Sequence, residues 1–196
     1  LELLRKVVRS SQMSKEGIDD SRQLLHEAQE ANDDSLVAYS VAFLINHLFA
    51  QSERDIDSIR YWTSYALPIA QRCQYWPMYF QMKYTLIQTY IYAHSYEYAK
   101  DEARRMVAEA KAQQAVTGQI IAYSCLAIAY YSTQQWKETE EALKHAHDLF
   151  SQNPPMANKI SVLKLTLTYL DAVNRYTDMR PYLIELRKEL NQMVSQ

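Results

Sequence analysis

The sequence predicts an all-α protein built from stacked helix pairs, and three observations support this fold class. The chain of 196 residues contains only 2 glycines, whereas the turns of a sheet protein draw heavily on glycine. Apolar residues recur three and four positions apart, which is the periodicity of an amphipathic helix. The same residue pattern returns after 40 positions, as in Leu86 and Leu126 (126 − 86 = 40). Because one helix pair cannot bury its own apolar face, such a repeat predicts an α-solenoid.

The repeat is clearest over residues 80–153 and can be followed along the whole chain. Its matching positions are Leu86 and Leu126, Tyr90 and Tyr130, Tyr96 and Trp136, Ala99 and Thr139, and Ala103 and Leu143. Of these, we expect Leu86, Leu126, Ala99 and Leu143 to be buried between helices. The pattern predicts about ten antiparallel helices in a single domain, as five units over residues 1–33, 34–75, 76–116, 117–153 and 154–196.

Residues that start or stop helices fall between the predicted helices. We expect Ser52 and Ser132 to cap the second helices of their units, and the run 32–34 to form a turn and an N-cap. Pro68 lies inside a predicted helix, where it should cause a kink or an early end. The other prolines are predicted at helix starts: Pro77, Pro154, Pro155 and Pro181.

The order of these residues resembles the tetratricopeptide repeat. The first helix of that family carries a leucine, a small residue and a tyrosine, and the second an aromatic, a small residue, a larger apolar residue and an alanine. Here these positions are Leu126, Ala127, Tyr130, Trp136, Thr139, Leu143 and Ala146. The family's period is about 34 residues, and the longer form is similar to repeats of bacterial signalling proteins, including transcription regulators and sensor histidine kinases. The resemblance implies a right-handed superhelix that binds protein or peptide and performs no chemistry of its own.

Charge and hydropathy limit the partners and the compartment. The net charge of −2 predicts no binding of nucleic acid by this domain. No apolar stretch approaches the eighteen or so residues that a membrane span needs, and no signal peptide is recognised. The first residue is Leu1 rather than Met, so we expect the chain to come from a longer protein. The compartment is therefore left open between cytoplasm and periplasm.

Motifs for catalysis and cofactor binding are missing from the sequence. It contains no His-Glu-x-x-His, no Cys-x-x-Cys and no glycine-rich phosphate loop. His145 and His147 are two residues apart and point to different sides of a helix, so we predict surface histidines. Cys73 and Cys125 are predicted not to pair, with Cys125 in the core. We expect no enzyme activity, no cofactor and no metal.

The 16 tyrosines supply the candidate binding residues. Spacing assigns some of them to the repeat core: Tyr90, Tyr96, Tyr130, Tyr169 and Tyr176. Others fall on the remaining face of a first helix, and in the resembling solenoids the first helices line the concave face. The candidate groove residues are Phe43, His47, Tyr84, Gln88, Tyr92, Ser124, Ile128 and Tyr131. Aromatic rings with a polar tip suit an interface, although the same residues could instead pack against a neighbouring helix.

Two functions of different classes follow from these predictions. The first is a sensory or regulatory module of a larger signalling protein that binds a peptide or protein in its groove. The alternative is a structural scaffold that mediates self-association, for example as a homodimer, through its ends or its convex face.

Overall fold

A computed structural model describes residues 17–52 and 54–194, and every regular element in these ranges is a helix. They form nine α-helices, labelled α2 to α10, and two short 3₁₀ segments, which confirms the all-α prediction. The predicted first helix, around Leu4, Val7 and Val8, lies outside the described residues. The chain divides into two compact units, Leu1–Thr89 and Tyr90–Gln196, and each is described by itself.

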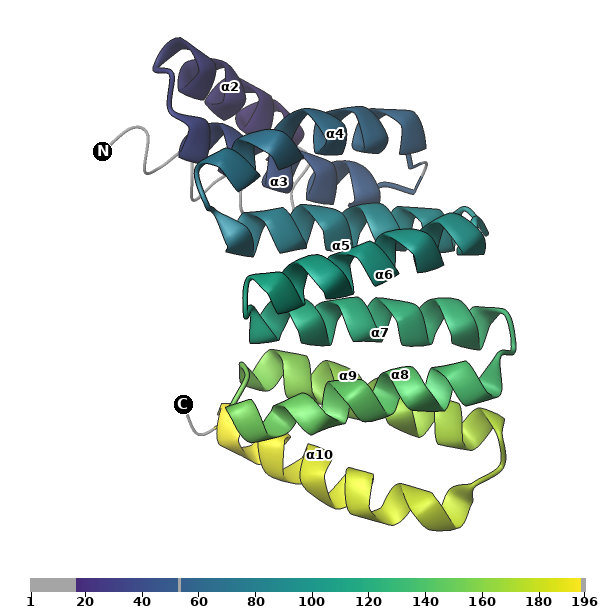
Figure 1. Ribbon diagram of the computed structural model, residues 1–196. Coiled ribbons are helices and arrows are strands. Elements are labelled where there is room, and N and C mark those ends of the chain that lie inside the picture. The colour runs from purple at the N-terminus through teal and green to yellow at the C-terminus, as the bar shows by residue number, and fades with distance from the viewer. Residues whose placement is uncertain (1–16, 53, 195–196) are drawn as a thin grey trace. The chain divides into compact units, whose positions relative to one another are not determined.

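The first unit contains α2 (Gly17–Glu30), α3 (Asp34–Ala50), α4 (Ile56–Arg72) and most of α5 (Trp76–Tyr92). Helix α2 packs on α3 and α3 packs on α4 (Figure 1). The hydroxyl of Thr85 on α5 donates to Oδ1 of Asn46 on α3 at 2.6 Å. The largest fully buried side chains include Leu24, Ile45 and Met82, so α2, α3 and α5 all contribute to the core of this unit.

The second unit contains α6 (Tyr96–Ala112), α7 (Val116–Ser132), α8 (Trp136–Asp148), the 3₁₀ segment η1 (Leu149–Gln152), α9 (Met156–Ala172), η2 (Tyr176–Asp178) and α10 (Met179–Val194). Each of its α-helices packs on the next in chain order, and α7 also contacts α9 (Figure 1). This packing is the arrangement expected of a solenoid-like repeat. The residues predicted to be buried between helices, Leu126, Ala99 and Leu143, are buried in this unit, and Leu86 is buried in the first.

The predicted period is confirmed by where the helices begin. Helices α4 to α9 start at residues 56, 76, 96, 116, 136 and 156, so successive helices start 20 residues apart and successive pairs 40 apart. Small residues of the repeat let neighbouring helices approach closely: Ala99, Ala103 and Ala110 of α6 are fully buried. Together with the burial of Leu86 and Leu126, this shows that the predicted register of the two central units matches the packing.

The turns between helices explain how the chain manages with so few glycines. Five of these turns hold one residue each in the left-handed conformation, at Gln74, His94, Gln114, Gln134 and Asn174, with φ between 52° and 57°. The next residue then donates its backbone N–H to the carbonyl five positions back, as from Ala115 to Ala110 at 2.8 Å. This is the Schellman ending of a helix, in which glycine is the usual left-handed residue. Here glutamine, histidine and asparagine adopt that conformation at a cost of roughly 1 kcal/mol each.

Several predicted helix ends are confirmed and others are corrected. Asp33 caps α3 and accepts from the N–H of Leu36 at 3.0 Å, and the four prolines predicted at helix starts lie within or directly before the first turn of a helix. The caps predicted at Ser52 and Ser132 are wrong. Asp55, which directly precedes α4, is its cap and accepts a hydrogen bond from the N–H of Ser58 at 2.9 Å. Ser132 is the last residue of α7 and so does not begin a helix.

Pro68 does not end its helix early, since α4 continues to Arg72. Proline removes one backbone hydrogen bond, and the remaining turns of α4 are held by the buried residues Ile59, Thr63, Ala66 and Ala70.

Candidate functional site

The predicted groove residues are divided equally between the two units. Phe43, His47, Tyr84 and Gln88 belong to the first unit, and Tyr92, Ser124, Ile128 and Tyr131 belong to the second. Two of them are exposed, Tyr84 at 37% and Tyr92 at 53% of their surface. Phe43, Gln88, Ser124, Ile128 and Tyr131 are half-buried. Tyr84 and Tyr92 are thus the members of this set best able to contact a partner.

The groove prediction is wrong for His47, which is buried. Helix α3 buries side chains around most of its circumference, so a position one turn beyond Phe43 faces the core and not solvent. Two other members of the set are committed to contacts within their own unit. Tyr131 packs against the edge of Trp136, with ring centroids 5.7 Å apart, and the hydroxyl of Ser124 donates to the carbonyl of Ile120 at 2.8 Å.

Exposed tyrosines on second helices were missed by the sequence reasoning. Tyr61 on α4 and Tyr98 on α6 are 64% and 69% exposed, more than any predicted groove residue. Tyr61 packs edge-on against Trp62 at 5.1 Å, and Trp62 packs in the same way against Tyr65. Tyr61 lies two positions after the buried Ile59, about 200° around the helix, which is a signal that the sequence already contains. Tyr176, predicted as a core residue, is also exposed, because it lies in the short segment η2 before α10 and not in a packed helix.

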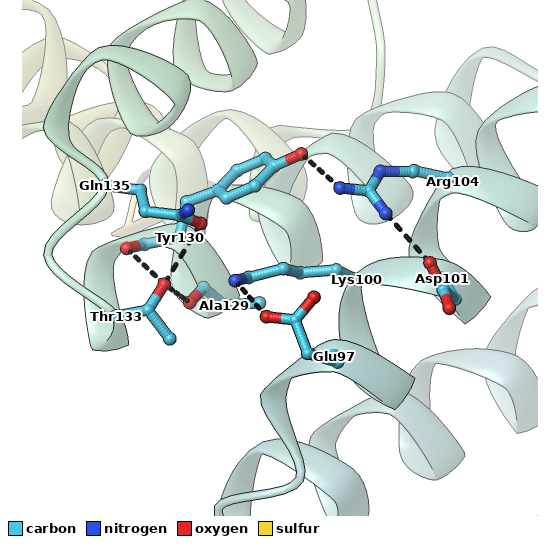
Figure 2. A network of polar contacts seen from close by, with 8 residues as sticks. All are labelled: Glu97, Lys100, Asp101, Arg104, Ala129, Tyr130, Thr133 and Gln135. Carbon is cyan, nitrogen blue, oxygen red and sulfur yellow. Dashed lines mark hydrogen bonds and ion pairs between the residues drawn. The ribbon is translucent and has the colours of Figure 1, made fainter.

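The junction between α6 and α7 carries a closed network of charges (Figure 2). Lys100 is only 2% exposed. Its ammonium group lies 2.8 Å from Oε1 of Glu97 and 5.5 Å from the ring centre of Tyr130. Arg104 donates to the Tyr130 hydroxyl at 3.1 Å and to Asp101 at 2.8 Å. These groups hold α6 against α7 through one tyrosine ring.

The electrostatics of the α6–α7 network are balanced. Two acids and two bases share the patch, and the Tyr130 hydroxyl raises the pKa of Arg104 by accepting its hydrogen bond. A cation over an aromatic face gains roughly 0.5–2 kcal/mol, more when it is shielded from water. Every charged group shown in Figure 2 has a partner of opposite charge, so the network is suited to fixing a helix contact.

A second polar cluster surrounds a cavity of about 260 Å³ between α8, α9 and α10, which we name the α8–α10 cavity. Arg175 lies between two carboxylates, donating to Oε1 of Glu140 at 2.6 Å and to Oδ2 of Asp178 at 2.7 Å. Both hydrogen bonds raise the pKa of the Arg175 guanidinium. The Tyr169 hydroxyl donates to the other oxygen of Glu140 at 3.3 Å, and burial raises the pKa of that hydroxyl.

His147 closes one side of this cavity. Its Nε2 lies 2.9 Å from the hydroxyl of Thr166, which donates its own proton to the carbonyl of Val162. Since the hydroxyl proton is used, Thr166 accepts from His147, and the proton of the neutral ring is on Nε2. Burial lowers the pKa of His147, and its ring packs against Phe150 at 4.8 Å and Tyr182 at 5.2 Å.

The prediction of two surface histidines is thus right for His145 and wrong for His147. His145 is exposed and stacks on the ring of Tyr123 at 5.0 Å. His147 is half-buried because η1 and α10 cover the end of α8, where it lies. The cavity itself could not be predicted, since Glu140, Thr166 and Arg175 come from three elements that only the fold brings together.

The first unit has a wider and more open depression near the start of α3. Its volume is about 350 Å³, and its lining includes Leu36, Tyr39, Cys73 and Tyr75. Burial raises the pKa of Tyr39, and Tyr75 adds to the effect. Cys73 and Cys125 are both free thiols, and Cys125 is buried, as predicted.

Residues 17–52 and 54–194 contain neither a metal-binding group nor a membrane-spanning helix. No group of three or more histidine, cysteine or acidic side chains in these ranges is arranged to hold a metal ion. None of the described helices is both long and apolar enough to cross a membrane. No protein family and no curated protein matches the chain.

Proposed function

We propose that the chain is a tetratricopeptide-like module that binds a protein or peptide, and that it serves as the sensory or regulatory domain of a larger bacterial signalling protein such as a sensor histidine kinase or transcription regulator. The observation that carries the proposal is the surface aromatic content. Six tyrosines and one tryptophan are among the exposed large apolar side chains of the described residues. Tyrosine and tryptophan are enriched in protein interfaces and at their energetic centres.

The repeat gives a physical reason why these tyrosines serve binding. The buried core consists mainly of leucine, isoleucine and alanine, and Tyr84 and Tyr92 do not belong to it because they stay exposed. A ring that stays exposed leaves apolar area in contact with water, which a partner can cover, while the hydroxyl keeps its hydrogen bonds. We therefore assign the binding surface to the exposed face of one first helix, α5, which carries Tyr84 in its middle and Tyr92 as its last residue.

A peptide-display selection on the immobilised chain tests this assignment. Peptides that bind the wild type are measured against Tyr84→Ala and Tyr92→Ala. Each variant should weaken binding by about 2 kcal/mol, or roughly thirty-fold, the loss typical of an aromatic anchor. The matched controls are Tyr61→Ala and Tyr98→Ala, which remove an exposed tyrosine of the same unit from a second helix. These controls should change the affinity less than two-fold.

Three results bear on the outcome. All four variants are expected to melt within a few degrees of the wild type, because exposed substitutions change stability little. If the controls lose affinity while Tyr84→Ala and Tyr92→Ala keep it, the partner binds the second helices and the groove assignment is wrong. If no library peptide binds more tightly than about 100 μM, peptide recognition itself is wrong.

Self-association is the second candidate, and one observation favours it. Helix α10 exposes Leu183, Ile184 and Met193, each at half of its surface or more. Exposed apolar side chains can take part in an interaction site. Sedimentation of the chain at rising concentration should then show a dimer, and Ile184→Glu should restore the monomer. A monomer at all concentrations up to about 500 μM would exclude this scaffold function at affinities relevant to a cell.

A further inference from the structure

The α8–α10 cavity combines opposite charges in a way that the two proposed functions do not use. Glu140 and Asp178 share the single cation Arg175, so this group of three carries a net charge of −1. Lys144 lies on the cavity one helical turn after Glu140. No carboxylate among the described residues lies within ion-pair distance of its ammonium group. The cavity therefore presents one unbalanced negative region and one unbalanced positive group, with a net charge of zero.

The rest of the lining is apolar or neutral. Leu143 and Leu170 are buried. His147 donates its Nε2–H to the Thr166 hydroxyl, burial lowers its pKa and so favours the neutral ring, and Tyr182 packs its ring on His147. A ligand must therefore match two charges of opposite sign and place an apolar group beside these leucines and rings.

The size of the cavity restricts the ligand further. At about 260 Å³, it falls below the roughly 300–1,000 Å³ of sites for drug-sized molecules. A nucleotide or a folded peptide segment is too large, and an inorganic ion would leave the apolar lining unused. A free α-amino acid carries one ammonium, one carboxylate and a side chain of this size.

We propose that the α8–α10 cavity binds a free α-amino acid with an apolar side chain. The ligand's carboxylate pairs with Lys144, and its ammonium group pairs with the carboxylates of Glu140 and Asp178. Its side chain packs on Leu143, Leu170 and the ring of Tyr182. This site is separate from the proposed peptide surface, and each can be present without the other.

A titration of the isotope-labelled full chain tests the proposal. Each common α-amino acid is added up to about 10 mM and the amide spectrum is recorded. At least one apolar amino acid should give saturable shifts confined to residues 140–147 and 166–182. Its amide, which lacks the carboxylate, and its N-acetyl form, which lacks the ammonium group, should each bind at least ten-fold more weakly, as expected when one charged hydrogen bond is lost.

Variants identify the groups that bind the ligand. Lys144→Gln should raise the dissociation constant at least ten-fold while leaving the melting temperature unchanged, because Lys144 is exposed. Arg175→Gln introduces the residue found at the matching position of the preceding repeat, Gln135. It should also weaken binding, because Arg175 no longer holds the carboxylates of Glu140 and Asp178 in place. The matched control is Lys137→Gln, a lysine of the same helix with 85% of its side chain exposed, which should bind like the wild type.

Each other result overturns the proposal. Saturable shifts from no amino acid would mean that the cavity holds no such ligand. Equal affinity for the amide form would make the site a cation site, and equal affinity for the N-acetyl form would make it an anion site. An equal loss in Lys144→Gln and Lys137→Gln would show that binding follows the net charge of the chain and not the cavity.

Discussion

The two polar junctions of the second unit lie at equivalent positions of the repeat but differ in chemistry. Lys100 at the α6–α7 junction corresponds to Glu140 at the α8–α9 junction (140 − 100 = 40). The first is a buried cation and the second an exposed acid. Each lies against a tyrosine on the following first helix, Tyr130 or Tyr169. The repeat therefore conserves the place of the contact and not its charge.

A tyrosine suits both junctions because a tyrosine hydroxyl can either donate or accept a hydrogen bond. The Tyr130 hydroxyl accepts from Arg104, whereas the Tyr169 hydroxyl donates to Glu140. At the first junction the ammonium group of Lys100 lies 5.5 Å from the centre of the Tyr130 ring. At the second, Arg175 and Asp178 enter from η2 and its approach, and a cavity stays open beside them. One junction thus fixes a helix contact, and the other is the site at which we propose that a ligand binds.

The largest expected effect concerns the core that both junctions share. Leu126 on α7 is buried, and Leu126→Ala should lower the unfolding free energy by about 2–5 kcal/mol because it leaves a cavity. Leu165 is the leucine next to the matching position, 166, on α9 and is half-buried, so Leu165→Ala should cost clearly less. Denaturant titration of both variants checks the order. A loss below about 0.5 kcal/mol for Leu126→Ala would show that the packing register is wrong.

Charge reversal distinguishes the junctions directly. Lys100→Glu puts a carboxylate into a buried position beside Glu97 and removes the cation that pairs with Glu97. We expect a loss of about 3 kcal/mol of unfolding free energy, the range for an uncompensated buried charge. Glu140→Lys at the exposed junction should cost less, since water screens the new cation from Arg175.

Lys100→Met is the control for this charge reversal. It keeps the aliphatic stem without the charge and should be close to neutral, because apolar replacement of a buried ion pair is often tolerated. If both reversals lower the unfolding free energy by the same amount, the difference in burial between the junctions does not affect stability.

The sequence predicted the parts of the molecule that depend on local spacing. The helices, the buried leucines and the N-cap in the run 32–34 follow from residues close together in the chain, and the 40-residue period follows from their repetition. What it could not predict depends on residues far apart. His47 was placed on a surface because its spacing fits a first-helix face, and only the packing around α3 shows that this face is covered. The α8–α10 cavity could not be predicted either, because Lys144 and Arg175 line the same cavity only once α8, α9 and α10 have packed together.

His147 should give the second junction a pH dependence of stability. Burial lowers its pKa in the folded protein below the usual 6.5, and the nearby Asp148 only partly opposes this. The unfolded chain then binds the proton more tightly, so the unfolding free energy falls as the pH drops below about 6.5. The slope is limited to about 1.4 kcal/mol per pH unit, the value for one proton. Chemical denaturation of wild type and His147→Leu between pH 5 and 8 should show a shallower slope in the variant, and equal slopes would contradict the assignment.

The smallest expected effect lies in the turns that lead into the two junctions. Gln114, before α7, and Asn153, before α9, are both left-handed, with φ of 52° and 50°. Glutamine has no local compensation for this conformation, whereas asparagine tolerates it. Gln114→Gly should therefore stabilise the chain by about 0.5–1 kcal/mol, the relief of the steric cost less the added entropy of the unfolded chain. Asn153→Gly should change the unfolding free energy by no more than a few tenths of a kcal/mol.

The control is Gln113→Gly, in the neighbouring position with φ −90°. This variant should destabilise the chain, because glycine relieves no strain at that φ and lowers the helix propensity. Stabilisation by Gln113→Gly would show that the gain at Gln114 has a source other than backbone strain.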